Sequence, residues 1–231
     1  MYINIVHYYE RYSKGRGMES LSTRRAQARD EQRRQTSEDI LDAALQLFIS
    51  EGYGAVTMRG IAARVGCSPG NLYHYFPGKN EIFLALRDQG FELFREYQAR
   101  TRDITDSVAR LRAHAAAYLR FAMEQPRHYE LMFLMPAVDP ESIPADMMER
   151  SRRSLDLLRS DLRACMADGA MREWDVDVAA IGMWSQLHGF ASLLLRRRLA
   201  LHTSLSDDRL AEELVAFMFA HIPLTSKEEG S

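Results

Sequence analysis

The stretch "VTMRGIAARVGCSPGNLYHYFPGKNEIF", residues 56–83, decides the fold of this chain. It holds four glycines, two prolines and a single acidic residue near its end. Thr57 and Ser68 each precede a short apolar run, in the position that favours a helix N-cap. Gly66 stands where a left-handed residue ends a helix, and Pro69 suits the first turn of the next helix. The stretch therefore predicts two short helices joined by a tight turn.

A longer helix is expected before this stretch. Thr36 is predicted to open it, with Asp39 as capping-box partner, and Gly52 to end it. Apolar residues at helical spacing give it one buried face: Ile40, Ala44, Leu47 and Phe48. Another long helix is expected over residues 79–100. A helix, a turn containing glycine and a short helix form the helix-turn-helix layout, whose second helix enters the major groove of DNA.

The composition of this motif suits a phosphate-facing surface. Residues 52–80 include three basic residues and no acidic one, so nothing there repels DNA. Gly70 lets the backbone approach base edges, and Asn71 can hydrogen-bond a base or a phosphate. The alternative that the whole aromatic run is core packing fits only Leu72 and Phe76, because consecutive helical residues cannot share one core face. The residues left outward are Tyr73, His74 and Tyr75.

Residues 36–86, "TSEDILDAALQLFISEGYGAVTMRGIAARVGCSPGNLYHYFPGKNEIFLAL", resemble the DNA-binding domain of TetR-family bacterial regulators, without a gap. The resemblance implies that Thr57, Arg59 and Lys79 lie mainly at operator phosphates. It also implies a recognition helix lined by Ser68, Pro69, Gly70, Asn71, Tyr73, His74 and Tyr75. Gly60 stands where the family usually has a polar residue, and glycine inside a helix costs about 1 kcal/mol of stability relative to alanine. Pro77-Gly78 replaces the polar pair that usually precedes the lysine. Neither departure removes the mechanism.

The rest of the chain is expected to be helical as well. The predicted helices cover residues 103–125, 127–135, 143–168, 174–200 and 206–222. "MWSQLHGFASLLL", residues 183–195, carries the spacing W-x-x-x-H-G and is similar to the ligand-binding domain of a WHG-type TetR subgroup. "YLRFAMEQPRHYELMF", residues 118–133, also resembles that subgroup. The resemblance implies dimerisation through the last two long helices, which would form a four-helix interface with their symmetry mates.

Methionine and aromatic residues of this C-terminal part are candidates for an adaptable apolar pocket. The same residues at helical spacing are equally typical of ordinary core, and His188 of a satisfied core or interface histidine. The pocket candidates are Tyr118, Phe121, Met132, Phe133, Trp184 and His188.

The whole chain excludes several classes of function. It has 231 residues and a net charge of −2, so a nucleic-acid surface must be local. Its two cysteines suit a reducing cytoplasm rather than a disulfide framework. No histidine, cysteine or glycine pattern indicates a metal site, a cofactor or a nucleotide, so an enzyme is not expected. No uninterrupted apolar run approaches the ~18–20 residues that span a membrane.

We expect an all-α chain with an N-terminal three-helix helix-turn-helix domain at residues 36–82. A helical ligand-binding and dimerisation domain is expected at 83–223, followed by a polar tail at 224–231. Residues 1–35 are expected to be a disordered or basic arm, whose part at 22–35 either tracks DNA or is a solvated tail. The first 17 residues differ in composition from the body, so we expect the native start at Met18.

The expected function is that of a cytoplasmic, homodimeric transcriptional repressor. It would bind double-stranded operator DNA and leave it when a small-molecule effector binds. One alternative is a DNA-binding activator or a regulator that responds to a protein partner. The other is an all-α carrier or enzyme with an incidental helix-turn-helix.

Overall fold

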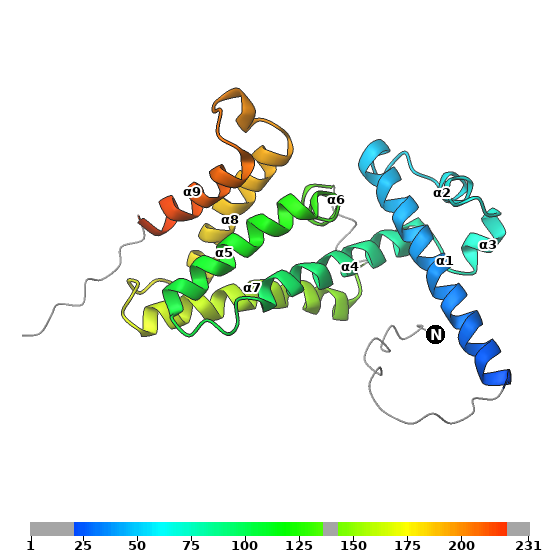
Figure 1. The fold of residues 1–231 in the computed structure, drawn as a ribbon, viewed down its shortest axis with the longest axis horizontal. Helices are drawn as coiled ribbons and strands as arrows, with labels where there is room; N and C mark the ends of the chain where they lie inside the picture. Colours follow the sequence, from blue (N-terminus) through cyan, green and yellow to red (C-terminus); the bar gives the residue numbers. More distant parts are fainter. Residues whose placement is uncertain (1–20, 136–142, 221–231) are drawn as a thin grey trace, which may run out of the picture. The chain divides into compact units, whose positions relative to one another are not determined.

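The structure is a computed structural model that describes residues 21–135 and 143–220. The expectations for residues 1–17 and 224–231 lie outside the described residues. In the described part every regular element is a helix, which confirms the predicted all-α fold (Figure 1). The elements are α1 Leu21–Glu51, α2 Met58–Val65, α3 Pro69–Tyr73, α4 Lys79–Ala99, α5 Ser107–Glu124, α6 Pro126–Tyr129, the π-helix η1 Glu130–Leu134, α7 Ala145–Ala167, α8 Val176–Leu195, the 3₁₀-helix η3 Leu199–Leu201 and α9 Asp207–Ala220.

Helix α1 begins at Leu21 and not at the predicted N-cap Thr36. The hydroxyl of Thr36 donates to the carbonyl of Gln32 at 2.9 Å, a bond of the helix interior. The capping-box prediction was therefore wrong. The physical reason is that the arginine, glutamine and alanine residues of the basic arm are good helix formers, so the helix extends through the arm. The chain divides into two compact units between Asp39 and Ile40.

The N-caps of both short helices and the end of α2 lie where the sequence predicts, whereas α3 ends at Tyr73 and does not continue to Pro77-Gly78 as expected. Thr57 accepts a hydrogen bond from the backbone N–H of Gly60 at 3.1 Å, and Ser68 accepts one from Asn71 at 3.2 Å. Gly66 has φ 78°, the left-handed conformation that ends α2. Glycine adopts this conformation without a clash because it has no Cβ atom. These caps hold α2 and α3 in the predicted arrangement, although α3 has only five helical residues.

Two hydrophobic cores organise the second unit, and α4 belongs to both. The first core is that of the helix-turn-helix domain, where Ile82, Phe83 and Leu86 of α4 are buried with residues of α1, α2 and α3. The second core receives Phe91 and Phe94 of α4, together with buried residues of α5, α7, α8 and α9. One continuous helix therefore carries side chains of both domains.

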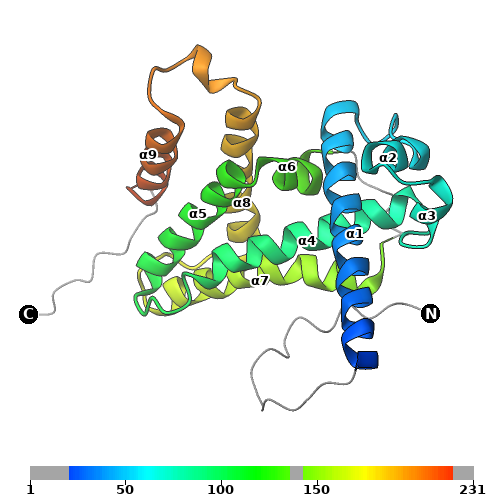
Figure 2. The ribbon, with the colours of Figure 1, turned by 45° about the vertical axis from the view of Figure 1, so that its right-hand side comes forward.

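In the C-terminal domain α4, α5 and α7 lie side by side, as both views show (Figures 1 and 2). Asp106 and Asp175 cap α5 and α8 through their carboxylates. The single helix predicted over residues 127–135 is instead a short α6 followed by η1. Met135 N–H donates to the Glu130 carbonyl at 2.9 Å, the i to i+5 bond of a π-helix.

Helix α8, with 20 residues, is long and apolar enough to cross a membrane by length and composition alone, and one 18-residue window of it has a mean hydropathy of 1.3. One such helix is weak support for a membrane span. One face of α8 is buried in the core, with Ala180, Met183 and Leu187. The composition of α8 is therefore that of a core helix whose outer face is also apolar.

Candidate functional site

Most of the residues predicted to contact DNA lie on the surface of the helix-turn-helix. Tyr73 is 53% exposed, although an aromatic ring of this size is usually buried. Val56 and Leu72, which flank and interrupt the predicted set, are buried in the domain core. The predicted contact residues that the structure exposes are Thr57, Arg59, Ser68, Pro69, Gly70, Asn71, Tyr73 and His74.

Two further predicted contacts, Tyr75 and Lys79, are half-buried. Tyr75 packs against the helix-turn-helix core, so it is less outward than the sequence suggests. The Nζ atom of Lys79 donates to the carbonyl of Tyr53 at 2.6 Å and lies 4.3 Å from the centre of the Tyr53 ring. Lys79 has three N–H groups, so its ammonium is positioned by Tyr53 with donors left over.

The capping hydroxyls have capacity left for a ligand. Thr57 and Ser68 use oxygen lone pairs to accept from backbone N–H groups, which leaves each hydroxyl proton available. Both residues are exposed. An anion near these caps would meet hydroxyl donors and, at α2, the free N–H groups of a helix N-terminus.

A cavity of about 450 Å³ lies in the C-terminal domain. Five of the six predicted pocket residues line it, from α5, η1 and α8. The sixth, Phe121, is fully buried and packs its ring against Phe94 and Tyr97 outside the lining. The lining residues are Arg87, Phe91, Phe94, Tyr118, Met132, Phe133, Ser151, Arg152, Ser154, Leu155, Trp184 and His188.

A chain of hydrogen bonds runs along the wall of this cavity. The indole N–H of Trp184 donates to Tyr118 Oη at 3.1 Å, and the Tyr118 and Tyr129 hydroxyls are 3.0 Å apart. Tyr129 Oη is 2.8 Å from His188 Nδ1. A consistent assignment has Tyr118 donating to Tyr129, and Tyr129 donating to His188. The ring of His188 then accepts at Nδ1 and carries its proton at Nε2.

Burial shifts the pKa values along this chain of hydrogen bonds so that the neutral form of each group is favoured. It raises the pKa of Tyr118 to about 12, against the lowering effect of the hydrogen bonds with Tyr129 and Trp184. It raises the pKa of Tyr129 further, with help from Tyr118. It lowers the pKa of His188 below its usual value. Tyr118, Tyr129 and His188 are therefore uncharged in this hydrogen-bond chain.

The sequence analysis missed the contribution of α4 and α7 to this cavity. Arg87, Phe91 and Phe94 are spaced i, i+4 and i+7, so they share one face of α4. That spacing was a usable signal, because an arginine on an otherwise apolar helix face is unusual. On α7, Ser151, Ser154 and Leu155 follow the same rule.

The π-helix η1 brings the cavity next to the helix-turn-helix core. Leu131 is 1% exposed and belongs to the core of the helix-turn-helix domain. The next two residues, Met132 and Phe133, line the cavity. On α4, Gly90 is so close to Met132 that an added Cβ would lie 2.9 Å from its Cγ. Neighbouring residues of one short element therefore contact both domains.

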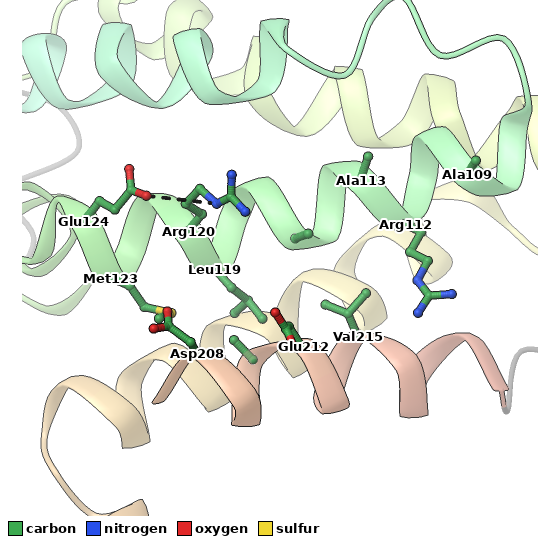
Figure 3. Close-up of a pocket in the computed structure, with 12 residues that line it drawn as sticks. Ala109, Arg112, Ala113, Leu119, Arg120, Met123, Glu124, Asp208, Glu212 and Val215 are labelled. Carbon is green, nitrogen blue, oxygen red and sulfur yellow. Dashed lines mark ion pairs between the residues drawn. The ribbon is translucent and has the colours of Figure 1, made fainter. Parts of the chain in front are cut away.

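A second cavity, of about 810 Å³, lies between α5 and α9. Figure 3 shows Leu119 and Met123 of α5 pointing toward α9, from which Asp208 and Glu212 point back. Its lining mixes two arginines with three acids, and one arginine pairs with Glu124 on the same helix. Aromatic rings are absent from this lining, so the 450 Å³ cavity is the better candidate for a small-molecule site.

One buried polar cluster contributes no residue to the lining of either cavity. Asp161 of α7 accepts from Arg110 at 2.8 Å and lies 2.9 Å from His114 Nδ1. Burial alone would raise the pKa of Asp161, but these hydrogen bonds lower it. His114 Nε2 is 3.0 Å from the Gln98 amide. The cluster joins α4, α5 and α7, and no group that could hold a metal ion occurs among the described residues.

Known protein families match both domains of the chain. A family model described as "Bacterial regulatory proteins, tetR family" matches residues 40–86, and one described as "Tetracyclin repressor-like, C-terminal domain" matches residues 111–218. The HTH-type transcriptional activator FasR of Mycolicibacterium smegmatis is 36% identical over 106 residues, which are 46% of this chain and 47% of that protein.

The HTH-type transcriptional repressor KstR of the same organism is 39% identical over 62 residues, 27% of this chain and 30% of that protein. The matched parts thus span less than half of either relative. The solved structure of AibR in complex with isovaleryl coenzyme A and operator DNA is similar in fold, with a TM-score of 0.65 and 21% identity. The similarity covers 80% of this chain and 98% of that one.

Proposed function

Because the chain belongs to the TetR family of bacterial transcriptional regulators, we propose that it is a homodimeric repressor which a small molecule releases from its operator. Proteins of this family are DNA-binding regulators and not enzymes. The observation that carries the proposal is the placement of η1. Leu131 lies in the core of the DNA-binding domain, and its neighbours Met132 and Phe133 lie at the effector cavity.

On the DNA side, the proposal rests on exposure and charge. Arg59, Asn71 and Tyr73 are exposed on α2 and α3. Residues 52–80 contain no acid that would oppose phosphate. In this proposal Arg59 contacts a phosphate and Tyr73 belongs to the recognition surface, as the family resemblance implies. Backbone contacts of this kind orient the protein, and base contacts supply the specificity.

The coupling between cavity and DNA follows from packing. A ligand that displaces Met132 or Phe133 must move η1, because interior side chains leave little free volume. Movement of η1 displaces Leu131 within the helix-turn-helix core, and α4 belongs to the same two cores. The ligand therefore favours one arrangement of the recognition helices over another. The change in the free-energy difference between these two arrangements equals the difference in the ligand's binding free energy to them.

Dimerisation is proposed through the outer face of α8, together with α9. Val178, Ile181 and Leu193 of α8 are 62%, 50% and 47% exposed, and between them lie the exposed small residues Gly182, Ser185 and Gly189. An apolar stripe of this kind is costly in water and suits close helix packing against a second copy. A two-fold dimer presents two recognition helices to successive major grooves.

The experiment is selection of bound sequences from a random duplex DNA pool, followed by gel shifts of the enriched duplex at several salt concentrations. We expect a two-fold symmetric site. Tyr73→Ala should weaken binding about tenfold or more, and Arg59→Ala should reduce the salt slope by about one. Arg64→Ala is the matched control on α2, since Arg64 bonds Gln46 instead. Lys79→Ala is a less clean test, because Lys79 also holds Tyr53.

Several outcomes decide against this assignment. No enriched sequence would contradict DNA binding itself, and equal binding by Tyr73→Ala, Arg59→Ala and the unaltered protein would contradict the proposed surface. The direction of regulation needs a reporter gene behind the enriched site, because FasR is named an activator and KstR a repressor. Repression by the unaltered protein is the expected result, and activation would favour the alternative.

A further inference from the structure

The wall of the 450 Å³ cavity suits a ligand with a compact apolar body. Its side chains are mostly rings and hydrocarbon, and this volume lies toward the lower end of the range of about 300–1,000 Å³ for small-molecule sites. The rings of Phe133, Trp184 and His188 lie within 6.4 Å of one another between centroids. Aromatic rings bury a large apolar area against a ligand, and they have few rotatable bonds that binding must order.

One group in this wall lacks what its chemistry requires. Arg87 is half-buried, its Nε is fully buried without a hydrogen-bond partner, and no acid forms an ion pair with it in residues 21–135 and 143–220. The adjacent Asp88 is taken by Arg150 at 2.6 Å. Within residues 21–135 and 143–220, the cavity lining includes no aspartate or glutamate. A buried guanidinium without a counter-charge is costly, and an anion in the cavity would relieve that cost.

Two uncharged donors line the same cavity. Ser154 is 7% exposed, and its hydroxyl has no partner among the described residues. His188 accepts at Nδ1 from Tyr129, which leaves the Nε2 proton for a ligand. Carboxylate oxygens accept from guanidinium, hydroxyl and imidazole groups alike. Arg152, exposed at the cavity, adds a second positive charge to the same side.

We propose that the cavity binds a small carboxylic acid as its anion. The apolar body lies against Phe91, Phe133 and Trp184, and the carboxylate accepts hydrogen bonds from Arg87 and Ser154. This proposal rests on the cavity being the effector site of the proposed regulator. It goes beyond that function by naming the ligand's charge and the residue that selects it. A neutral ligand would leave Arg87 unpaired, and a cationic ligand would meet two arginines and no acid among the described lining residues.

The test compares matched ligands that differ only in the head group. The probes are decanoate, decan-1-ol and decylamine, and the pair 4-phenylbutanoate and 4-phenylbutan-1-ol, each below its aggregation limit. Binding is followed through the fluorescence of Trp184 in a Trp174→Phe background, because the chain has only these two tryptophans. Each carboxylate should bind about tenfold or more tightly than its alcohol, and decylamine should bind least. Carboxylates that bind no better than their alcohols would overturn the proposal.

Variants assign the preference to Arg87. Arg87→Met should bring the ratio of carboxylate to alcohol affinity close to one. Arg95→Met is the matched control: it makes the same change on α4, where Arg95 also has a buried Nε without a partner, yet it lies outside the cavity lining. Should Arg87→Met fail to fold, Ser154→Ala gives a milder test, with a several-fold smaller ratio expected. An unchanged ratio in a folded Arg87→Met protein would refute the role of Arg87.

The outcome is separable from that of the proposed function. Gel shifts with the selected duplex are repeated with decanoate and with decan-1-ol. Arg87-dependent binding of decanoate without an effect on DNA would support the ligand class and contradict effector control. Selective DNA binding together with no carboxylate preference would keep the regulator and reject the ligand class.

Discussion

Two cations of helix α4 have opposite surroundings. Lys79 donates to the Tyr53 carbonyl and lies over the Tyr53 ring, which positions its ammonium at the edge of the proposed DNA-binding surface. Arg87 has a buried Nε without a partner, and burial lowers its pKa from the usual value. At the scale of single residues, therefore, Lys79 is positioned by a contact within the protein, and Arg87 is the proposed ligand contact because its unpaired group also lines a cavity.

His188 gives a pH dependence at this scale. Burial lowers its pKa in the folded state, so below about pH 6.5 the unfolded chain binds more protons than the folded protein. The stability contributed by the neutral ring is fully present above the unfolded pKa and is lost as the pH falls toward the folded pKa. We expect the melting temperature to fall between about pH 7 and pH 5, and less steeply in His188→Gln.

Nuclear magnetic resonance of the His188 ring protons, assigned through the same variant, measures the pKa directly. His128, whose pKa burial also lowers, adds to the slope in both proteins, so the difference between them reports His188. A His188 ring that titrates at or above its ordinary value would contradict this prediction.

At the scale of elements, η1 and α4 form the contact between cavity and DNA-binding domain. The five residues of η1 would present different faces in a regular α-helix, because the i to i+5 bond adds a residue to the turn. Gly90 permits the close approach of α4 to Met132, and it has no Cβ to prevent it. The element pair is therefore sensitive to single added atoms.

Gly90→Ala should destabilise the protein by about 1–3 kcal/mol, because the added methyl group overlaps the buried Met132 side chain. Thermal unfolding measures the loss. Adding Met132→Ala to Gly90→Ala should restore part of the lost stability, so the effects of the two substitutions on the free energy of unfolding should be non-additive. Gly60→Ala is the control, since its Cβ would lie at an ordinary 3.4 Å from Thr57 Oγ1. It should stabilise the protein by up to about 1 kcal/mol. Additive effects of the two changes at α4 and η1 would contradict the proposed contact.

At the scale of the whole molecule, we propose that a second copy covers the apolar outer face of α8. Its residues alternate between those that complete the C-terminal core and those left exposed, such as Ile181. A repressor with two recognition helices needs the same dimer for operator spacing. One surface therefore accounts both for the hydropathy of α8 and for the symmetry of the proposed DNA site.

Ile181→Glu should convert the dimer to a folded monomer, because it places a charge in the proposed interface and leaves the monomer core untouched. Sedimentation velocity measures the mass, circular dichroism the helix content, and a gel shift the expected loss of DNA binding. Ala63→Glu, at an exposed position of α2, is the matched control and should remain dimeric. An Ile181→Glu protein that is still a dimer would place the interface elsewhere.

Much of the helix-turn-helix was predictable because its signals are local. Thr57, Ser68 and Gly66 act through their own backbone neighbours, and the structure confirms each as a helix boundary. The start of α1 was mispredicted because Thr36 has the chemistry of a cap, whereas the residues before it favour helix as strongly as those after it. Local preference cannot decide between two acceptable starts.

The C-terminal cavity was only partly predictable. Aromatic residues such as Trp184 and Phe133 are equally suited to a core and to a pocket. Composition therefore could not separate Phe121, which is buried in the core, from the five candidates that line the cavity. Arg87 was overlooked because its sequence neighbours belong to the DNA-binding domain. Its role depends on α7 and α8, which are distant in sequence.

The sequence by itself determined the helical class, the starts of the two short helices, the end of α2 and the acid-free surface around them. These properties depend on capping, backbone conformation and charge within a few residues. Only the tertiary structure decided that Leu131 completes one core while Met132 lines the cavity of the other domain, and that Arg87 stands in that cavity without a counter-charge. Contacts between distant segments depend on how whole helices pack, and no local pattern encodes them.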